Sequence, residues 1–370
     1  MAAQLPDLRK PFVLPDVSAS IGERVTRAAR SIVHGLLSDP HDGRYLDRPC
    51  PAESERIAYR TPDGWRCALT RYPAAPGSSG EPVLLATGLA LNHLSVDYGP
   101  DVSLVRRLQA HGFDVFVFGH RSDPLAGPPS NPTPFDVDTI VEDDLSIAID
   151  RVLEVTGFER LGWIGFGFGG VLLYHHLARI GDPNRFFGAV TLGAPAQFEA
   201  SRSVARQARW LARLLPDSVE LPTEWALRWL SPGASADPVD QGPSWAHSTD
   251  GPRIRGLMRH SVTDLHGGVA KQIARWVANG HITDRSGAVD TLVALTGSTL
   301  PLLCVQARGD SVAPPASVQA IGEHWHAEAF ELLELDSSWG HVDMLASEDA
   351  PRAVFDPTIG FLDRHRAKAW

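Results

Sequence analysis

Cysteine and long apolar runs are the first things that this 370-residue sequence lacks. Only three cysteines occur, Cys50, Cys67 and Cys304, and their number and spacing exclude a disulfide framework and a cysteine-ligated zinc site, so a reducing compartment is expected. No segment reaches the roughly eighteen consecutive apolar residues that a membrane span needs, and the opening MAAQLPDLRKPFVLPDV has no apolar signal-peptide core. The sequence therefore predicts a cytoplasmic protein that does not span a membrane.

The sequence also has fewer basic than acidic residues. The chain has 34 Lys and Arg residues against 44 Asp and Glu residues, a formal net charge of -10 and a pI near 5.8. Because no basic stripe stands out to neutralise phosphates, this balance argues against nucleic acid or an anionic membrane as a partner. The 43% hydrophobic content supports a large buried core, in one elaborated domain or in a core with an insertion.

Strand-like and helix-like segments alternate along most of the chain. Residues 1–52 come first and are interpreted as an accessory extension with one helix-period segment, Ile21–Leu37. Residues 55–72 then alternate around Pro62-Asp63-Gly64, which is typical of a β-hairpin. Further strands are predicted over 81–88, 113–118, 161–164, 187–192, 302–306 and 330–335, and helices over 103–111, 137–156, 171–180, 316–324 and 350–366.

Residues 196–300 interrupt this alternation. The segment is helical in character, rich in proline and glycine, and contains five of the ten tryptophans, namely Trp210, Trp225, Trp229, Trp245 and Trp276. It is interpreted as an inserted helical cap, and its tryptophans as a group suggest an apolar roof over a pocket. The fold class predicted from the two flanking parts, 53–195 and 301–370, is α/β, with a mostly parallel central sheet flanked by helices. Ligands of such sheets bind beyond the carboxyl ends of the strands.

A sharp glycine turn between a strand and a helix is the most informative motif. Residues 161–170 read Leu-Gly-Trp-Ile-Gly-Phe-Gly-Phe-Gly-Gly, followed by the apolar run of a helix. In a G-x-S-x-G nucleophile elbow, serine occupies the middle of such a turn. Here Gly165 and Gly169 frame that position, but the residue between them is Gly167. The elbow is therefore predicted without its nucleophile.

The chain resembles the α/β-hydrolase superfamily, and within it the branch of acid-lipase-like esterases and polyhydroxyalkanoate-synthase-like hydrolases. The resemblance covers roughly residues 53–366 and rests on the elbow and on several further motifs. These motifs are TPDGWRCALTRY, Gly88 after the first long strand, HGFDVFVFGHR, the helix FDVDTIVEDDLSIAIDRVLEVTG, and the late loops ARGDSVAPP and WGHVDM. The order of elbow, acid and histidine along the chain is the one that this fold uses.

The resemblance implies a set of site residues. Asp310 matches the family's acid and His341 its catalytic histidine, which together imply a dyad in which the carboxylate orients the imidazole. The family's oxyanion donors are backbone N–H groups, which correspond here to Leu89 and Phe168. No cofactor and no metal are implied, and the implied partner is a small apolar or acyl molecule.

Gly167 departs from the family's pattern and excludes an acyl-enzyme intermediate, because glycine has no hydroxyl or thiol. It accepts the positive φ of the turn at no steric cost. Three other serines, Ser122, Ser337 and Ser338, lie near predicted strand ends, but none is on a strained turn. Cys304 lies inside a predicted strand and is interpreted as a small core residue.

Two further patterns have competing interpretations. Gly165-x-Gly167-x-x-Gly170 matches the dinucleotide fingerprint between a strand and a helix, yet the next strand ends without the acidic residue that binds a ribose. The adjacent His175 and His176 follow the elbow, but neighbouring residues of a helix do not share a face, which argues against a metal site there.

Three functions remain open at this stage. The first is an enzyme that uses Asp310 and His341 as a general base, for hydrolysis by direct water attack, an elimination or a cyclisation of a bulky apolar acyl, ester, thioester or lactone-type substrate. The second is a serine esterase or thioesterase inactivated at position 167. The third is a non-catalytic protein that binds an apolar ligand in the hydrolase pocket. The substrate's identity and the oligomeric state are left open.

Overall fold

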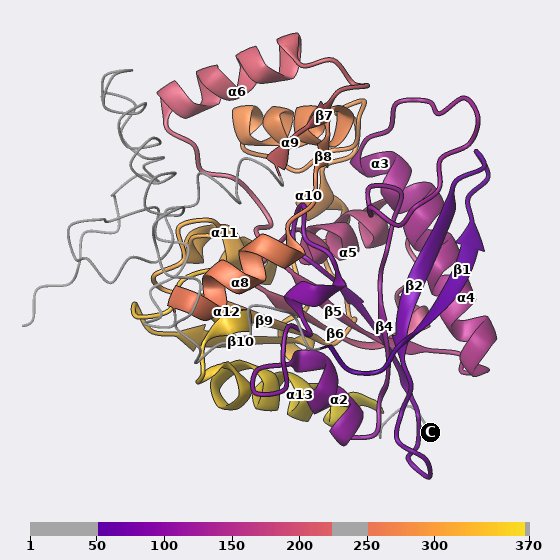
Figure 1. Ribbon diagram of the computed structural model, residues 1–370. Coiled ribbons are helices and arrows are strands. Elements are labelled where there is room, and N and C mark those ends of the chain that lie inside the picture. Colours follow the sequence, from indigo (N-terminus) through magenta and orange to yellow (C-terminus); the bar gives the residue numbers. More distant parts are fainter. Residues whose placement is uncertain (1–50, 224–250, 367–370) are drawn as a thin grey trace, which may run out of the picture.

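The computed structural model describes residues 51–223 and 251–366 (Figure 1). The helix expected over 21–37 lies outside the described residues, as do Trp225, Trp229 and Trp245. None of the helices in the described parts is long and apolar enough to cross a bilayer.

A mostly parallel sheet of eight strands forms the centre of the molecule, in the order β1-β2-β4-β3-β5-β6-β9-β10. The predicted hairpin is confirmed, because β1 and β2 pair antiparallel with Ala58 opposite Ala68. β2 also runs antiparallel to β4, and all the remaining neighbours are parallel. The strands are β1 (Glu55–Arg60), β2 (Arg66–Tyr72), β3 (Pro82–Ala86), β4 (Asp114–Val117), β5 (Leu161–Phe166), β6 (Phe186–Leu192), β9 (Leu302–Ala307) and β10 (Phe330–Leu335).

Helices cover both faces of this sheet (Figure 1). One face packs against the buried cluster that contains residues of α2, α12 and α13, and the other face against residues of α4 and α5. The mostly parallel sheet predicted from the sequence is thereby confirmed. The helices of these two layers are α2 (Leu104–Ala110), α3 (Val137–Thr139), α4 (Ser146–Thr156), α5 (Phe168–Arg179), α11 (Pro315–Gln319), α12 (Asp343–Ala346) and α13 (Asp356–Arg366).

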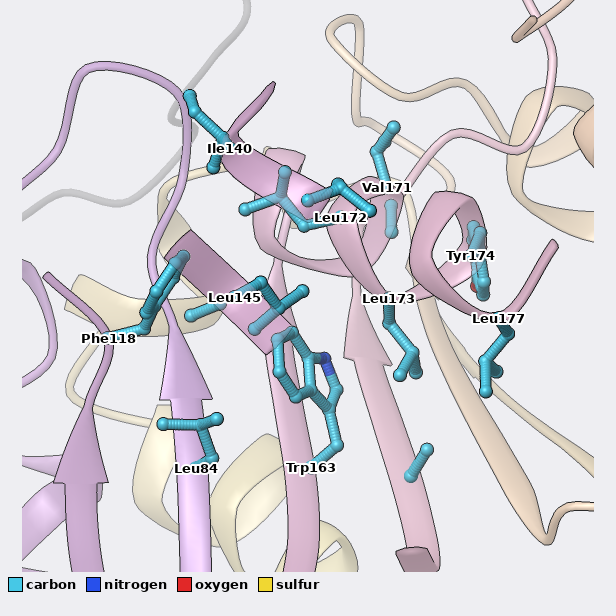
Figure 2. Close-up of a cluster of buried hydrophobic side chains, with 14 of the residues drawn as sticks. Leu84, Phe118, Ile140, Leu145, Trp163, Val171, Leu172, Leu173, Tyr174 and Leu177 are labelled. Carbon is cyan, nitrogen blue, oxygen red and sulfur yellow. The ribbon is translucent and has the colours of Figure 1, made fainter. Parts of the chain in front are cut away.

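The larger buried cluster lies under α5. Trp163 of β5 is fully buried, and Figure 2 shows it beneath the side chains of Leu145 and Leu173. Because β5 is buried along its whole length, its residues are apolar or glycine at every position, which is the pattern of a central parallel strand. This packing holds the strand and helix on either side of the glycine turn.

One helix predicted over 137–156 is divided into three parts. A single α-helical turn, α3, leads into a π-helical turn, Ile140–Leu145, which is followed by α4. Within the π-helical turn, Asp144 is fully buried and pairs with Arg121, at 2.7 Å between Oδ1 and Nη2. The apolar periodicity alone could not indicate this change of winding, because it reports which residues are buried and not the hydrogen-bond pattern.

The chain between β6 and β9, called here the β6–β9 segment (residues 196–300), is mainly helical where it is described. It contains α6 (Arg202–Leu214), α8 (Gly251–Ser261), α9 (Gly267–Asn279), α10 (Thr291–Ala294) and the short pair β7 (Glu220–Leu221) and β8 (Leu265–His266). The suggestion of a tryptophan roof is wrong for the two tryptophans that are described. Trp210 points outward from α6, and Trp276 is buried in the core, where its Nε1–H donates to the carbonyl of Thr283 at 2.7 Å.

Candidate active site

The predicted elbow position lies in a sharp glycine turn between β5 and α5. Gly167 has φ 49° and ψ −109°, and α5 begins at the next residue. Its N–H donates to the carbonyl of Leu192 on the neighbouring strand β6, at 2.8 Å. Positive φ strains any residue with a Cβ, so glycine adopts this turn without that cost. The position in the middle of the elbow is thus fully formed without a side chain.

The flanking glycines are explained by close packing. A Cβ on Gly165 would collide with the backbone of Gly169 and Gly170, and a Cβ on Gly169 would collide with the carbonyl of Ala86. Gly170 in turn lies against Ala194. These contacts hold α5 against β3 and β5. Close packing of helix and strands thus accounts for the glycines that match the dinucleotide fingerprint, without a bound dinucleotide.

Asp310 and His341 meet at the carboxyl ends of β9 and β10. Nδ1 of His341 is 2.7 Å from Oδ2 of Asp310. The other carboxylate oxygen accepts hydrogen bonds from the N–H groups of Val312 and Ala313, at 2.7 and 2.8 Å. Asp310 is buried and its two oxygens are both engaged, so its orientation toward the imidazole is set by the loop backbone.

The other ring nitrogen of His341 is directed at the elbow. An ideal Cβ placed on Gly167 would lie 3.0 Å from Nε2 of His341 and 3.4 Å from its Cε1. The ring of Phe166, at the end of β5, lies 4.6 Å from the imidazole between centroids and supports it from one side. The imidazole therefore lies directly against Gly167, with Nε2 as the ring atom nearest to a Cβ at that position.

A narrow pocket with a cavity volume of about 20 Å³, open to solvent, lies beside the glycine turn. Leu89 and Phe168 both line it, and within the described residues neither of their N–H groups donates a hydrogen bond. Ala90 is the one described non-glycine residue with positive φ, 56°, and its carbonyl accepts from the N–H of Thr263 at 2.8 Å. The pocket is lined by Leu89, Ala90, Leu91, Asn92, Phe118, His120, Ser122, Asp123, Ile140, Phe168, Thr263, Asp264, Leu265 and Val269.

One end of the pocket is polar, and sequence reasoning missed most of it. Burial lowers the pKa of His120 to about 4, so the ring is neutral near pH 7. Its Nδ1 accepts from the N–H of Ser122 at 3.2 Å, which leaves the proton on Nε2. The hydroxyl of Ser122 is buried without a hydrogen-bond partner in the described residues. The sequence did contain a sign of this polar end, because His120 to Asp123 come just after a buried strand, where ligands of parallel sheets bind.

The remaining candidates lie apart from the dyad. Ser338 binds the carboxylate of Asp336 through its N–H at 2.8 Å and its hydroxyl, in a local turn. Cys304 is buried in β9, where burial raises the pKa of its thiol to about 11. His176 is buried on α5, and its pKa is lowered by burial to about 4. Within the described residues no group of three His, Cys, Asp or Glu could hold a metal ion.

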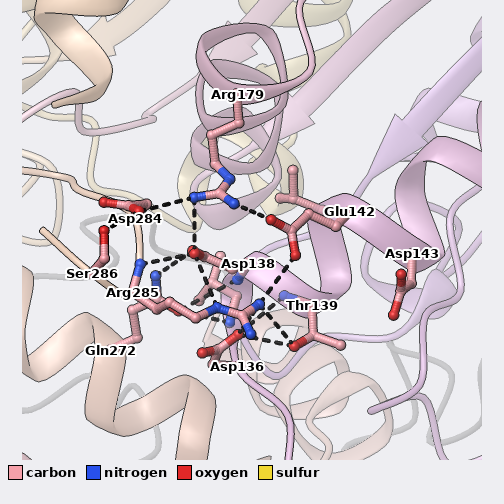
Figure 3. A network of polar contacts seen from close by, with 12 residues as sticks. Asp136, Asp138, Thr139, Glu142, Asp143, Arg179, Gln272, Asp284, Arg285 and Ser286 are labelled. Atoms are coloured by element: carbon pink, nitrogen blue, oxygen red, sulfur yellow. Dashed lines mark hydrogen bonds and ion pairs between the residues drawn. The ribbon is translucent and has the colours of Figure 1, made fainter. Parts of the chain in front are cut away.

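His175 belongs to a second aspartate–histidine pair that the sequence did not indicate. Its Nε2 lies 2.8 Å from Oδ1 of Asp138, and its Nδ1 lies 3.0 Å from the hydroxyl of Thr291. Asp138 also accepts from Gln272 at 2.6 Å and from the N–H of Arg285 at 2.8 Å (Figure 3). Although burial raises the pKa of Asp138, these hydrogen bonds and His175 lower it well below its usual range. Within the described residues, both oxygens of Asp138 and both ring nitrogens of His175 therefore have partners.

No family model matches this chain, and no curated protein matches it either. Solved structures do. A structure titled as a DcsB complex with its substrate analogue aligns with a TM-score of 0.59 at 17% identity, covering 85% of this chain and 100% of that one. A putative aryl esterase from Burkholderia cenocepacia aligns at 0.56 and 19% identity, with 85% and 100% coverage. The alpha/beta hydrolase GrgF from Penicillium sp. sh18 aligns at 0.57 and 16% identity, again with 85% and 100% coverage.

Proposed function

Because this chain has the α/β-hydrolase fold, we propose that it is an enzyme in which Asp310 and His341 activate water directly, on a bulky apolar acyl substrate. The substrate bond is an ester, thioester or lactone. In this proposal Gly167 is the native solution to the site, and the space beside it holds the attacking water in place of a serine hydroxyl.

One observation carries the proposal, namely the direction of His341. Its Nδ1 is bound to Asp310 at 2.7 Å, while Nε2 faces the position of the absent side chain at 3.0 Å. With Nδ1 as the donor, Nε2 keeps its lone pair and is a base. A water molecule at hydrogen-bonding distance from Nε2 would occupy the place that a serine side chain takes in the elbow.

The reaction then balances with water as the only co-reactant. Nε2 of His341 takes a proton as the water oxygen forms a bond to the acyl carbon, and the carbonyl electrons move onto its oxygen. The N–H groups of Leu89 and Phe168 stabilise that oxyanion, the latter with the dipole at the start of α5. The bond to the leaving group breaks as His341 returns the proton to it. The products are a carboxylic acid and an alcohol or thiol.

The lining of the pocket supports the substrate class. Phe118, Ile140, Phe168, Leu265 and Val269 supply an apolar wall. The polar end around His120 and Ser122 lies in the same pocket and offers donors for one oxygen of the substrate. The titles of two similar structures name an aryl esterase and a hydrolase, which agrees with acyl chemistry.

Turnover of a panel of p-nitrophenyl esters and acyl thioesters of increasing chain length tests the proposal. His341→Ala should lower turnover by about 10³-fold, without changing the melting temperature by more than a few degrees. His326→Ala is the matched control, because this exposed histidine precedes the amino end of β10, whereas His341 follows its carboxyl end. Unchanged turnover in His341→Ala would exclude the dyad as the base.

A second variant separates water attack from acyl-enzyme chemistry. Gly167→Ser should become labelled at that position by a fluorophosphonate, while the unaltered chain stays unlabelled and shows no acyl adduct in its mass spectrum during turnover. His341 must move by a few tenths of an ångström to admit the new Cβ. If only the serine variant turns substrates over, the chain is an inactivated esterase or a binding protein, and water attack is wrong.

A further inference from the structure

Helix α6 is the outermost element of the β6–β9 segment. It lies on α9 at the top of the molecule, away from the central sheet (Figure 1). Only Val204 and Ala212 of its thirteen residues are buried. Most of the helix surface is therefore exposed among the described residues.

Four arginines form one stripe along this helix. Arg202, Arg206, Arg209 and Arg213 follow the spacing i, i+4, i+7 and i+11, which places them on the same side of an α-helix. The helix contains no acidic residue. Within the described residues no carboxylate forms an ion pair with any of the four, and Arg209 alone donates to a carbonyl, that of Ala278 at 3.3 Å. Asp217, just beyond the helix, is paired with Lys271 at 2.9 Å.

An apolar stripe runs beside the arginines. Trp210 is 64% exposed, Leu214 is 66% exposed and Leu211 is 47% exposed. Trp210 and Leu214 are four residues apart and so lie one turn above the other. Large apolar side chains are more often covered. Three of them stand on one helix next to four arginines that pair with no carboxylate in the described residues, and together they form an amphipathic surface.

We propose that α6 docks onto an anionic lipid surface, with the arginines at the headgroups and Trp210 and Leu214 inserted at the acyl boundary. The net charge of the whole chain is -10, so composition gave no sign of this local stripe. The arginines of α6 therefore correct the earlier conclusion that the chain has no basic stripe. Nucleic acid would neutralise the arginines but would leave the leucines in water. A lipid interface satisfies both stripes at once.

The proposed docking helix α6 belongs to the same β6–β9 segment as two residues that line the pocket. α6 packs on α9, and Leu265, just before α9, and Val269, within it, both line the pocket. An apolar acyl substrate partitions into a bilayer, so docking through α6 would bring the pocket to its source. This last step rests on the proposed function, whereas the docking itself does not.

Co-sedimentation of the full chain with vesicles tests the docking. Vesicles of phosphatidylcholine alone are compared with an equimolar mixture of phosphatidylcholine and phosphatidylglycerol. Binding is expected to the anionic vesicles and to weaken as salt rises. Arg206→Glu with Arg213→Glu should weaken it by about 30-fold or more, and Trp210→Ala with Leu214→Ala by about tenfold.

Matched controls separate the helix from general charge and hydrophobicity. Arg160→Glu with Arg352→Glu makes the same charge change on exposed arginines elsewhere, and Val293→Ala with Leu332→Ala removes exposed apolar side chains elsewhere. Both pairs should bind as the unaltered chain does. His341→Ala should also bind normally, so the failure of the proposed function would leave the vesicle result intact.

Three outcomes would overturn the proposal. Equal binding to neutral and anionic vesicles would remove the role of the arginines. Full binding by both α6 variants would place the contact on another surface. A dimer that Trp210→Ala with Leu214→Ala converts to monomer, in a chain that does not bind vesicles, would show that a second copy covers the helix.

Discussion

The molecule contains two aspartate–histidine pairs of nearly the same length that differ in what surrounds them. Asp310 and His341 are 2.7 Å apart, and Asp138 and His175 are 2.8 Å apart. Both carboxylates are fully buried at the side-chain level. In the first pair one ring nitrogen faces the empty position of the elbow, whereas in the second pair both ring nitrogens are bound.

The comparison shows that a buried carboxylate beside an imidazole does not by itself indicate catalysis. The carboxylate of Asp138 and both ring nitrogens of His175 are bound to other parts of the fold, with partners from α5, α9, α10 and the loop after α9. The Asp310 pair leaves Nε2 of His341 directed at Gly167, without a hydrogen-bond partner in the described residues. We expect this unbound ring nitrogen to be the feature that distinguishes the two pairs.

The largest expected difference comes from removing the charge of each carboxylate in turn. Asp310→Asn should lower turnover by about 10³- to 10⁴-fold, because the amide no longer holds the imidazole in the tautomer that leaves Nε2 basic. Asp138→Asn should leave turnover within about threefold when measured well below its melting temperature. Equal losses of turnover in the two variants would contradict the expected difference in role between the two aspartate–histidine pairs.

For stability, we expect the change at Asp138 to have the larger effect. Asp138→Asn should lower the free energy of unfolding by about 3 kcal/mol or more, because His175, Arg179 and Arg285 lose a buried partner. Urea denaturation measures this loss. Asp150→Asn, which disrupts an exposed pair with Arg185, should cost less than about 1 kcal/mol.

The same carboxylate gives stability a pH dependence of known sign. The pKa of Asp138 is lowered in the folded chain, so its contribution is fully present above the ordinary value of 3.8 and is lost as the pH falls below that value. Unfolding in acid should therefore be steeper for the unaltered chain than for Asp138→Asn. Parallel curves for the two proteins between pH 4 and pH 2 would contradict a native carboxylate at this position.

The smallest effect is expected from Thr291→Val, which frees the second ring nitrogen of His175. The change removes a buried hydrogen bond of 3.0 Å and should cost about 1 kcal/mol. It makes the buried pair resemble the Asp310 pair in having one unbound nitrogen, but without access to a pocket. A thermal melt should show the loss, and no new esterase activity should accompany it in a His341→Ala background.

The sequence predicted the elements whose signals are local. The hairpin over 55–72 follows from a turn motif between alternating residues. Asp310 and His341 were assigned through the resemblance of their two loops to the α/β-hydrolase family, and the structure brings the two side chains together. The glycine at 167 could be interpreted as an elbow for the same reason. These features depend on neighbours within about ten residues along the chain.

Features that depend on packing between distant elements could not be predicted. Asp138 and His175 lie on different helices, and nothing in either segment indicates that α3 would turn its carboxylate toward α5. Trp276 was assigned to a pocket roof because its neighbours along the chain say nothing about which face of α9 meets the core. Overall charge likewise could not reveal that four arginines gather on α6.

The Asp138 carboxylate also constrains how molecules enter and leave. Swinging the β6–β9 segment away from the sheet would pull Gln272 and Arg285 off a buried charge that His175 and Arg179 hold from the other side. The loops at 89–92 and 263–265, which line the pocket, are not among the partners of Asp138. We therefore expect the pocket to open by small movements of these loops, which are faster than a swing of the whole β6–β9 segment.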